Sequence, residues 1–401
     1  MRSWSDPLLA LLSRDGAGLL VALVAGIVAG VLALGGQGAV GTGLATLGAG
    51  LAIALALASL RQLATLARAR RAHPPPGRMI DLGGYRVHLL AEGRARDGRP
   101  PVVWFAGGHA GGLAIHHLHR AFRGETRSIL IDRPGTGWSD TGPFPRTTAR
   151  EAEEVVLALE RAGERGPFVW AGHSFGGLLV ANVARRRPDL VHTLVLLDPT
   201  PLETIVFGPR LGALKAMRRQ AWWGGIGLLF GFDLRQRAEA KARQDPAHAR
   251  VIDAVRAALG PDLEPSRRVE AHPGRCFAEA SIFRELTPEG VAACAWDTVV
   301  YDRDLGDLPV WLVGPRDDQD ADIAALPEAR AGSDASARRM FRFFAATRER
   351  YLATSTRSRR VVAPAGSGHN FVYEAPEWTI GVLREAICGT ATEPGEAQDD
   401  R

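Results

Sequence analysis

This chain of 401 residues has little cysteine and almost no lysine. The three cysteines, Cys276, Cys294 and Cys388, lie far apart without paired spacing, which favours neither a disulfide framework nor a zinc site. Lysine occurs only at Lys215 and Lys241, so arginine supplies nearly all of the positive charge. The basic residues are scattered and do not alternate with aromatic residues, so we do not expect nucleic acid as a partner.

Charge is missing from a long segment near the N-terminus. No charged side chain occurs from Gly16 to Leu60, and one helix of that length would rise about 65 Å, roughly twice the hydrocarbon thickness of a membrane. Glycines interrupt the run at residues 35–38. The segment therefore predicts two transmembrane helices, near residues 17–34 and 39–59. A cleaved signal peptide is the alternative, but its apolar core spans only about 7–15 residues.

The charges that flank this segment predict its orientation. Arg2 and Arg14 precede the first apolar run, Arg61 and Arg68 follow the second, and the turn between them is uncharged. The positive-inside rule then places both ends in the cytoplasm. We expect residues 1–73 to be a membrane anchor with two spans, and the rest of the chain to be cytoplasmic. The proline-rich stretch at residues 74–77 is a stiff spacer that marks the boundary.

Beyond residue 77, short apolar runs alternate with amphipathic stretches. Runs such as residues 102–105 and 195–197 are apolar on both faces, as buried strands of a parallel sheet require. The alternation predicts an α/β domain over residues 77–388, with a mostly parallel, eight-stranded sheet flanked by helices. The expected strands are 79–82, 86–91, 102–105, 128–131, 168–171, 193–197, 310–313 and 360–363. The expected helices are 113–122, 148–162, 175–187, 335–352 and 376–387.

The alternation stops between Pro199 and about Gly306. This region has helical stretches near residues 211–217, 235–243, 251–259 and 277–286, and we interpret it as a cap inserted between two strands. Its residues 221–230 are unusually apolar, which is typical of a cap core, a lipophilic pocket or a membrane contact. Residues 389–401 are polar, and we expect them to be disordered.

The segment Gly172-His173-Ser174-Phe175-Gly176 carries the strongest chemical signal. A buried-strand pattern precedes it and a helix pattern follows it, which is the strand–turn–helix context of a nucleophile elbow. The glycines two positions before and after the serine leave room for a strained turn. The N–H groups of the following helix then face a developing oxyanion. We predict that Ser174 is a nucleophile.

A serine hydroxyl is a weak nucleophile and needs a base, which in turn needs a carboxylate to orient it. His369 follows the last expected strand and is the predicted base. Asp317, after the strand 310–313, is the predicted acid, with Asp318 next and Asp198 as a third candidate. The chain order Ser, Asp, His is that of hydrolases with a nucleophile elbow.

Two backbone N–H groups are needed to hold the oxyanion. The residue after the nucleophile, Phe175, is one predicted donor. Gly108, in the glycine-rich loop after the strand 102–105, is the other, with Gly107 and His109 as alternatives.

We expect neither a cofactor nor a metal for this chemistry. The cluster His116-His117-x-His119 has the residue type for a metal site but lacks a cysteine or carboxylate at suitable spacing. We interpret it as a solvated helix face.

These motifs resemble the α/β-hydrolase fold family, particularly its fold-1 group of serine esterases, from about Asp81 to Ile387. The segments that carry the resemblance are 102–108, the Asp-Arg-x-Gly-x-Gly-x-Ser loop at 132–139, 172–177, 196–199 and 368–369. The resemblance implies a structural role for the loop, so Asp132 and Arg133 receive no catalytic role. Two departures are the Ala106-Gly107 pair, where the family has His-Gly, and the doubled aspartate with a long insertion before His369.

The resemblance implies a serine hydrolase of the esterase or lipase kind, which cleaves a carboxylic ester of a small molecule or lipid through an acyl-enzyme on Ser174. An acyltransferase or thioesterase with the same triad is one alternative. A non-catalytic, membrane-tethered binding module is another. A serine at the elbow disfavours dehalogenase and epoxide-hydrolase chemistry, which uses an aspartate there.

Overall fold

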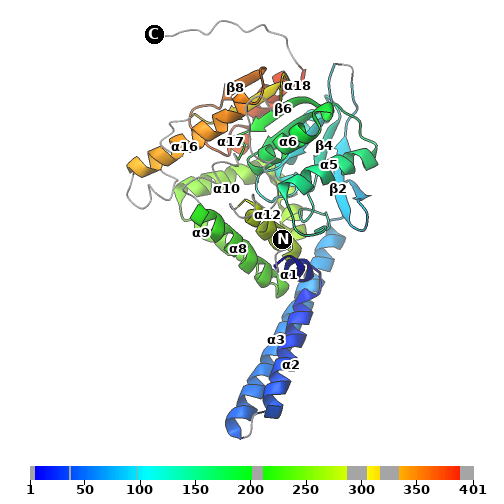
Figure 1. Cartoon of the computed structure of the whole chain (residues 1–401), viewed down its shortest axis with the longest axis vertical. Helices are drawn as coiled ribbons and strands as arrows, with labels where there is room; N and C mark the ends of the chain where they lie inside the picture. The colour runs from blue at the N-terminus through cyan, green and yellow to red at the C-terminus, as the bar shows by residue number, and fades with distance from the viewer. Residues whose placement is uncertain are drawn as a thin grey trace.

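A computed structural model of the chain describes residues 5–35, 38–96, 98–200, 211–286, 305–316 and 334–388. A long helical hairpin projects from one end of a body made of sheet and helices (Figure 1). The hairpin consists of α2 (Ala17–Gly35) and α3 (Ala39–Ala72). A short helix that the sequence did not predict, α1 (Ser5–Leu12), lies where the hairpin meets the body.

The body contains the eight-stranded sheet that the sequence predicts. Its strands are β1 (Arg78–Asp81), β2 (Arg86–Glu92), β3 (Val102–Phe105), β4 (Ser128–Ile131), β5 (Phe168–His173), β6 (Val191–Leu197), β7 (Val310–Gly314) and β8 (Ser358–Val362). They lie in the order β1-β2-β4-β3-β5-β6-β7-β8. β1 pairs with β2, and β2 with β4, in antiparallel fashion, and the other pairs are parallel. The α/β-hydrolase fold is therefore confirmed.

Helices cover both faces of the sheet, which explains why its central strands are apolar on both sides. On one face, α5 (Thr148–Ala162) and α6 (Phe175–Arg186) enclose a core with Trp170 at its centre. On the other face, α4 (His116–Phe122) and α18 (Pro376–Cys388) pack around Trp104. The remaining short or peripheral elements are η1 (Gly112–Ile115), η2 (Pro188–Leu190), α16 (Asp334–Ala353) and α17 (Phe371–Glu374).

The connection between β6 and β7 contains a group of helices. These are α8 (Leu211–Leu229), α9 (Leu234–Ala242), α10 (Pro246–Leu259), η3 (Gly260–Asp262), α11 (Leu263–Val269) and α12 (Pro273–Glu285). The sequence predicts the first helix only to residue 217, but α8 continues through Gly224 and Gly225. A Cβ atom at Gly225 would lie 2.6 Å from the ring of Phe277. The glycines thus let α8 lie close to α12, and this contact outweighs their poor helix propensity.

The hairpin exposes apolar side chains along its length. Leu34 is 90% exposed, Val40 78% and Leu47 73%. A Cβ atom at Gly48 would lie 2.7 Å from Cβ of Ala29, so small residues allow the two helices to approach closely. Both helices are long and apolar enough to cross a membrane. α2 agrees with the predicted span 17–34, whereas α3 extends past the predicted end at residue 59. We call its last part, residues 61–72, the stalk of α3.

Candidate active site

Ser174 occupies the turn between β5 and α6. Its φ angle is 53°, a strained value for a residue with a side chain. A Cβ atom at Gly172 would lie 2.3 Å from the carbonyl oxygen of Gly176, and one at Gly176 would lie 2.6 Å from that of Phe105. Only glycine fits at either position, which accounts for the spacing of the motif. The Ser174 N–H donates to the Leu197 carbonyl at 3.0 Å and ties the turn to β6.

His369 lies beside Ser174, as the sequence predicts. It comes from the loop between β8 and α17, and its Nε2 is 3.0 Å from the Ser174 Oγ. Its Nδ1 is 2.5 Å from Oδ2 of Asp198. Because a carboxylate only accepts, Nδ1 carries the proton and Nε2 accepts from the serine hydroxyl, an assignment made from these partners.

The carboxylate that contacts His369 belongs to Asp198, the third candidate of the sequence analysis. It follows β6 directly, has a φ angle of 45° and is 3% exposed. Burial alone would raise the pKa of Asp198, but the charges of Arg348 and His369 outweigh burial and hold this pKa at about 2. Arg348, from α16, donates to the second carboxylate oxygen. The first two candidates, Asp317 and Asp318, lie outside the described residues.

His173, which the sequence analysis quoted only as part of the elbow, supports the base. Its Nε2–H donates to the main-chain carbonyl of His369 at 2.9 Å. Burial, reinforced by the nearby charge of His369, lowers the pKa of His173 to about 3. The ring is therefore neutral across the physiological range and holds the His369 loop without adding charge. No sequence signal distinguishes this role from that of any residue next to a nucleophile.

The glycine-rich loop after β3 passes directly over the nucleophile. A Cβ atom at Gly107 would lie 2.9 Å from Nδ1 of His173 and 3.0 Å from Cβ of Ser174. Gly108 has a φ angle of 56°, which favours glycine. Phe175 is the first residue of α6, where backbone N–H groups have no intrahelical acceptor. The predicted oxyanion donors Gly108 and Phe175 thus flank Ser174.

Arg133 links these two predicted donors. Its guanidinium donates to the Gly108 carbonyl and lies 5.2 Å from the centroid of the Phe175 ring. It also donates to the Glu151 carboxylate at 3.3 Å, and both side chains are almost fully buried. The sequence analysis gave Arg133 no catalytic role, and nothing in the geometry places it on the reacting atoms. It holds the loop over the elbow.

Thr200 is a further polar neighbour of the nucleophile. Its Oγ1 is 3.5 Å from the Ser174 Oγ, and its N–H donates to the Ser174 carbonyl at 3.0 Å. The Tyr351 hydroxyl donates to the Thr200 carbonyl at 3.3 Å. The start of the β6–β7 connection is therefore tied to the elbow.

The interpretation of the histidine cluster as a solvated helix face is wrong. His119 is fully buried, with Nε2 2.9 Å from Oε2 of Glu92 and Nδ1 2.9 Å from Oγ of Ser128. Burial lowers the pKa of both His117 and His119 to about 4. Glu92 and Ser128 come from β2 and β4, so local spacing could not reveal them. The ligand atoms of Glu92, His116 and His119 lie within 4.8 Å of one another, a separation that a metal ion can bridge.

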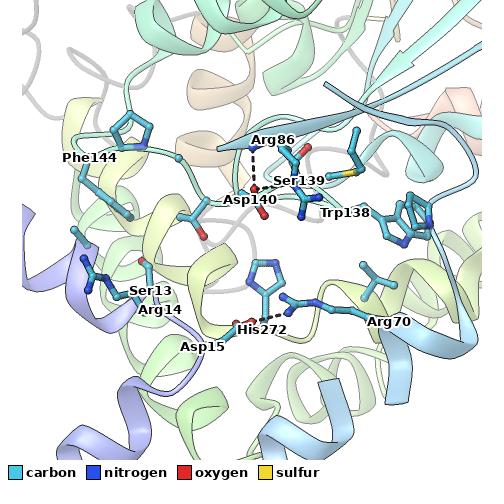
Figure 2. Close-up of a pocket in the computed structure, with 18 residues that line it drawn as sticks. Ser13, Arg14, Asp15, Arg70, Arg86, Trp138, Ser139, Asp140, Phe144 and His272 are labelled. Carbon is cyan, nitrogen blue, oxygen red and sulfur yellow. Dashed lines mark hydrogen bonds and ion pairs between the residues drawn. The ribbon is translucent and has the colours of Figure 1, made fainter. Parts of the chain in front are cut away.

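A separate cavity of about 690 Å³ lies where the hairpin meets the body (Figure 2). Its walls come from α1, the stalk of α3 and residues 137–144. Arg70 on the stalk pairs with Asp15 at 2.5 Å, and the Arg86 N–H donates to Asp140 at 2.8 Å. The ring of His272 points into the cavity, and burial lowers its pKa to about 3. Each of these pairs lies within one part of the chain, whereas Gln62 on α3 donates to the Ala271 carbonyl of the body at 2.9 Å and so connects the anchor to the body.

The sheet, the strained serine and the histidine beside it are features of α/β hydrolases. Residues 100–226 match the family model described as the alpha/beta hydrolase fold. This chain therefore has the α/β-hydrolase fold, and about a third of it matches the family model.

Two relatives of known sequence match over about a third of the chain. A 2-(acetamidomethylene)succinate hydrolase of Mesorhizobium japonicum is 27% identical over 124 residues, which cover 31% of this chain and 43% of that protein. A vacuolar membrane protein of Saccharomyces cerevisiae is 30% identical over 133 residues, which cover 28% of this chain and 20% of that protein. The chain thus spans less than half of the length of these relatives.

Solved structures match over a larger share of the chain. Cfl2 of Burkholderia cenocepacia aligns with a TM-score of 0.53 at 21% identity, covering 77% of this chain and 95% of its own. The haloalkane dehalogenase DatA of Agrobacterium tumefaciens aligns with a TM-score of 0.50 at 18% identity, covering 77% and 95%. At these identities the likeness shows the fold alone.

Proposed function

We propose that this chain is a membrane-anchored serine hydrolase that cleaves a carboxylic ester through an acyl-enzyme on Ser174. The observation that carries this proposal is the continuous line of contacts from the Ser174 Oγ through the His369 imidazole to the Asp198 carboxylate. Asp198, rather than the first-ranked Asp317, is the acid of the proposed triad. Its low pKa keeps it anionic, which stabilises the imidazolium that forms during the reaction.

The geometry supports two half-reactions. His369 Nε2 takes the hydroxyl proton as Ser174 Oγ attacks the ester carbonyl, and the N–H groups of Phe175 and Gly108 hold the resulting oxyanion. His369 then protonates the leaving alcohol, and the acyl group stays on the serine. In the second half, His369 takes a proton from water, which attacks the acyl-enzyme. The acid leaves and Ser174 regains its proton.

We also propose that α2 and α3 cross a membrane as a hairpin with both ends on the cytoplasmic side. The exposed apolar surface of both helices supports this, as does the flanking arginine pattern. The ester would be a small molecule or a membrane lipid.

A panel of esters of graded acyl length, assayed with the full chain in detergent, tests the proposed activity. Ser174→Ala should reduce turnover by at least about a thousand-fold. The matched variant Ser266→Ala, on α11, should retain wild-type turnover. Equal activity of wild type and Ser174→Ala would rule the proposal out.

The products separate the alternatives. Free acid as the only product supports hydrolysis, whereas transfer of the acyl group to an added lipid acceptor would assign an acyltransferase. Faster turnover of thioesters than of matched oxygen esters would assign a thioesterase. Absence of turnover on all substrates, with an unlabelled Ser174, would leave the non-catalytic binding module.

A further inference from the structure

One face of α8 combines basic and aromatic side chains around a groove of about 580 Å³. The residues that line it are Lys215, Arg218, Arg219, Trp222, Trp223 and Ile226. Their spacing of three and four residues places them along one side of the helix. Trp223 is 62% exposed, an unusual state for the largest apolar side chain.

The opposite side of α8 is occupied by its own fold. A Cβ atom at Gly224 would lie 3.4 Å from the Cys276 sulfur, and one at Gly225 would lie 2.6 Å from the Phe277 ring. The Trp222 ring meets Phe277 edge-on, with centroids 5.1 Å apart. Since α12 packs against this side, the groove lies on the side of α8 that is turned away from α12.

The C-terminal end of α8 lies at the top of the hairpin (Figure 1). A Cβ atom at Gly18 would lie 2.5 Å from the Ser59 Oγ and 2.6 Å from the Leu229 carbonyl oxygen. Gly18 and Ser59 stand at the two ends of the charge-free segment. The last residue of α8 is therefore level with the boundary where the hairpin would leave the hydrocarbon.

The side chains of the groove change in character with distance from that boundary. At 1.5 Å per residue, Trp223 lies about 9 Å along the helix from Leu229, and Lys215 lies about 21 Å from it. Because the helix is inclined, the heights above the boundary are smaller. The aromatic residues thus come nearest to the level of lipid headgroups and the basic residues stand just above, which is the order that membrane interfaces favour.

The charge of the groove is of one sign. α8 contains no acidic residue, and a negative surface potential is characteristic of the cytoplasmic leaflet. The cavity at the hairpin junction differs, because acidic side chains, Asp15 and Asp140, line it beside Arg70 and Arg86. The groove of α8 is therefore the better complement to an anionic lipid.

We propose that the α8 groove binds anionic phospholipid of the cytoplasmic leaflet. Lys215 and Arg219 contact the phosphate, while the exposed Trp223 lies between the headgroup and the acyl chains. The inference rests on the proposed membrane hairpin and is independent of the chemistry at Ser174. It makes the cap a second membrane contact, which fixes the orientation of the body above the bilayer.

The test uses the full chain in lipid nanodiscs and the quenching of tryptophan fluorescence by brominated acyl chains. One set of discs contains brominated phosphatidylglycerol with unbrominated phosphatidylcholine. The other set contains unbrominated phosphatidylglycerol with brominated phosphatidylcholine, and the total amount of bromine is equal in both. The contribution of Trp223 is the difference between wild type and Trp223→Phe. We expect this difference to be several-fold larger when phosphatidylglycerol carries the bromine.

Charge-reversal variants then distinguish binding in the groove from general electrostatic attraction of the chain to anionic lipid. Lys215→Glu combined with Arg219→Glu should lower the apparent affinity for phosphatidylglycerol about tenfold or more. The matched control is Arg339→Glu combined with Arg342→Glu, two exposed arginines on α16 that lie far from the hairpin. Unchanged circular dichroism and thermal unfolding in both double variants show that they are folded.

The outcomes are distinct. Equal quenching by the two lipids, or equal effects of the two charge reversals, would overturn the groove proposal while leaving the hairpin intact. Failure of the wild-type chain to enter discs would overturn the hairpin and the groove together. Neither result would affect the serine chemistry, which is measured in detergent.

Discussion

The sheet and the hairpin use similar apolar residues in opposite ways. Trp104 and Trp170 in the sheet are 0% exposed, whereas Leu34 and Val40 in the hairpin are 90% and 78% exposed. The sheet buries its apolar surface against the helices of its own chain. Among the described residues the hairpin packs mainly on itself, and in the proposed topology the bilayer covers its apolar surface. Both regions are thus apolar, and what differs is the source of burial.

The two regions also differ in their polar groups. In the body, buried charges are matched, as in Arg133 with Glu151 and Arg146 with Glu154. Such pairs fix geometry because breaking one leaves an uncompensated buried charge. The active site depends on this fixed geometry, while the hairpin depends only on length and hydrophobicity. Substitutions in the body should therefore lower activity or stability, whereas substitutions in the hairpin should impair membrane insertion.

The largest expected effect comes from Asp198→Asn. Loss of the carboxylate removes the partner that fixes the His369 tautomer, so kcat/KM for ester hydrolysis should fall about ten-thousand-fold while the elbow remains intact. The matched change Asp317→Asn should stay within a few-fold of wild type. A large loss in Asp317→Asn with activity retained in Asp198→Asn would assign the acid to Asp317.

The next largest effect is expected from Gly107→Ala. The added Cβ atom would meet His173 and Ser174 at about 3 Å, which displaces the loop that carries the Gly108 N–H. Loss of an oxyanion donor typically lowers kcat by about a hundred-fold or more. Gly124→Ala, where a Cβ atom meets nothing within 4 Å, is the control. Unchanged kcat in Gly107→Ala would show that the loop does not serve the oxyanion.

In the hairpin, Leu47→Arg should impair membrane insertion without touching the active site. An arginine at the centre of a span costs roughly 2.5–3.5 kcal/mol in insertion, equivalent to about a hundred-fold. Ala64→Arg adds the same charge to the exposed stalk of α3, outside the proposed span, and should insert normally. Resistance to alkaline carbonate extraction measures the difference. Equal extraction of the two variants would contradict the proposed span.

The smallest effect is the share of a single buried histidine in the stability of the body against acid. His117, His119, His173 and His272 are buried, and burial lowers their pKa values to about 3 or 4. Between those values and about 6.5 the unfolded chain binds more protons, so unfolding free energy should fall as pH drops from 6.5 toward 4. Each histidine contributes up to about 1.4 kcal/mol per pH unit in that window.

Unfolding by denaturant at pH 7, 6 and 5, followed by ester turnover and intrinsic fluorescence, measures this slope. His119→Gln should reduce the dependence of the unfolding free energy on pH by the contribution of one histidine. A stability that is constant from pH 7 to pH 5 would show that these histidines titrate normally in the folded body.

The parts that the sequence predicts are those set by local pattern. All eight strands fall within a few residues of their expected bounds because runs such as Val102–Phe105 are short, apolar and bounded by glycine or proline. The glycine spacing around Ser174 defines the elbow, and the charge-free run defines the hairpin. α8 was predicted too short because the contact that tolerates Gly225 comes from Phe277, far along the chain.

The acid of the proposed triad is a feature that local sequence pattern could not predict. Aspartates follow both β6 and β7, so sequence position cannot decide between them. In the structure the side chain of His369 reaches Asp198, which also contacts Arg348 of α16. Likewise, the link that Arg133 makes between Gly108 and Phe175 joins three segments that are distant in sequence. Such contacts follow only from the assembled fold.

The central claim is that Ser174 is activated by His369 and Asp198. Labelling of the full chain with a fluorophosphonate probe, followed by mass spectrometry of the peptides, tests it most directly. The account predicts one adduct, on Ser174, which is lost in His369→Ala and forms at least about a thousand-fold more slowly in Asp198→Asn. An adduct on another residue, or equal labelling rates in wild type and His369→Ala, would contradict it.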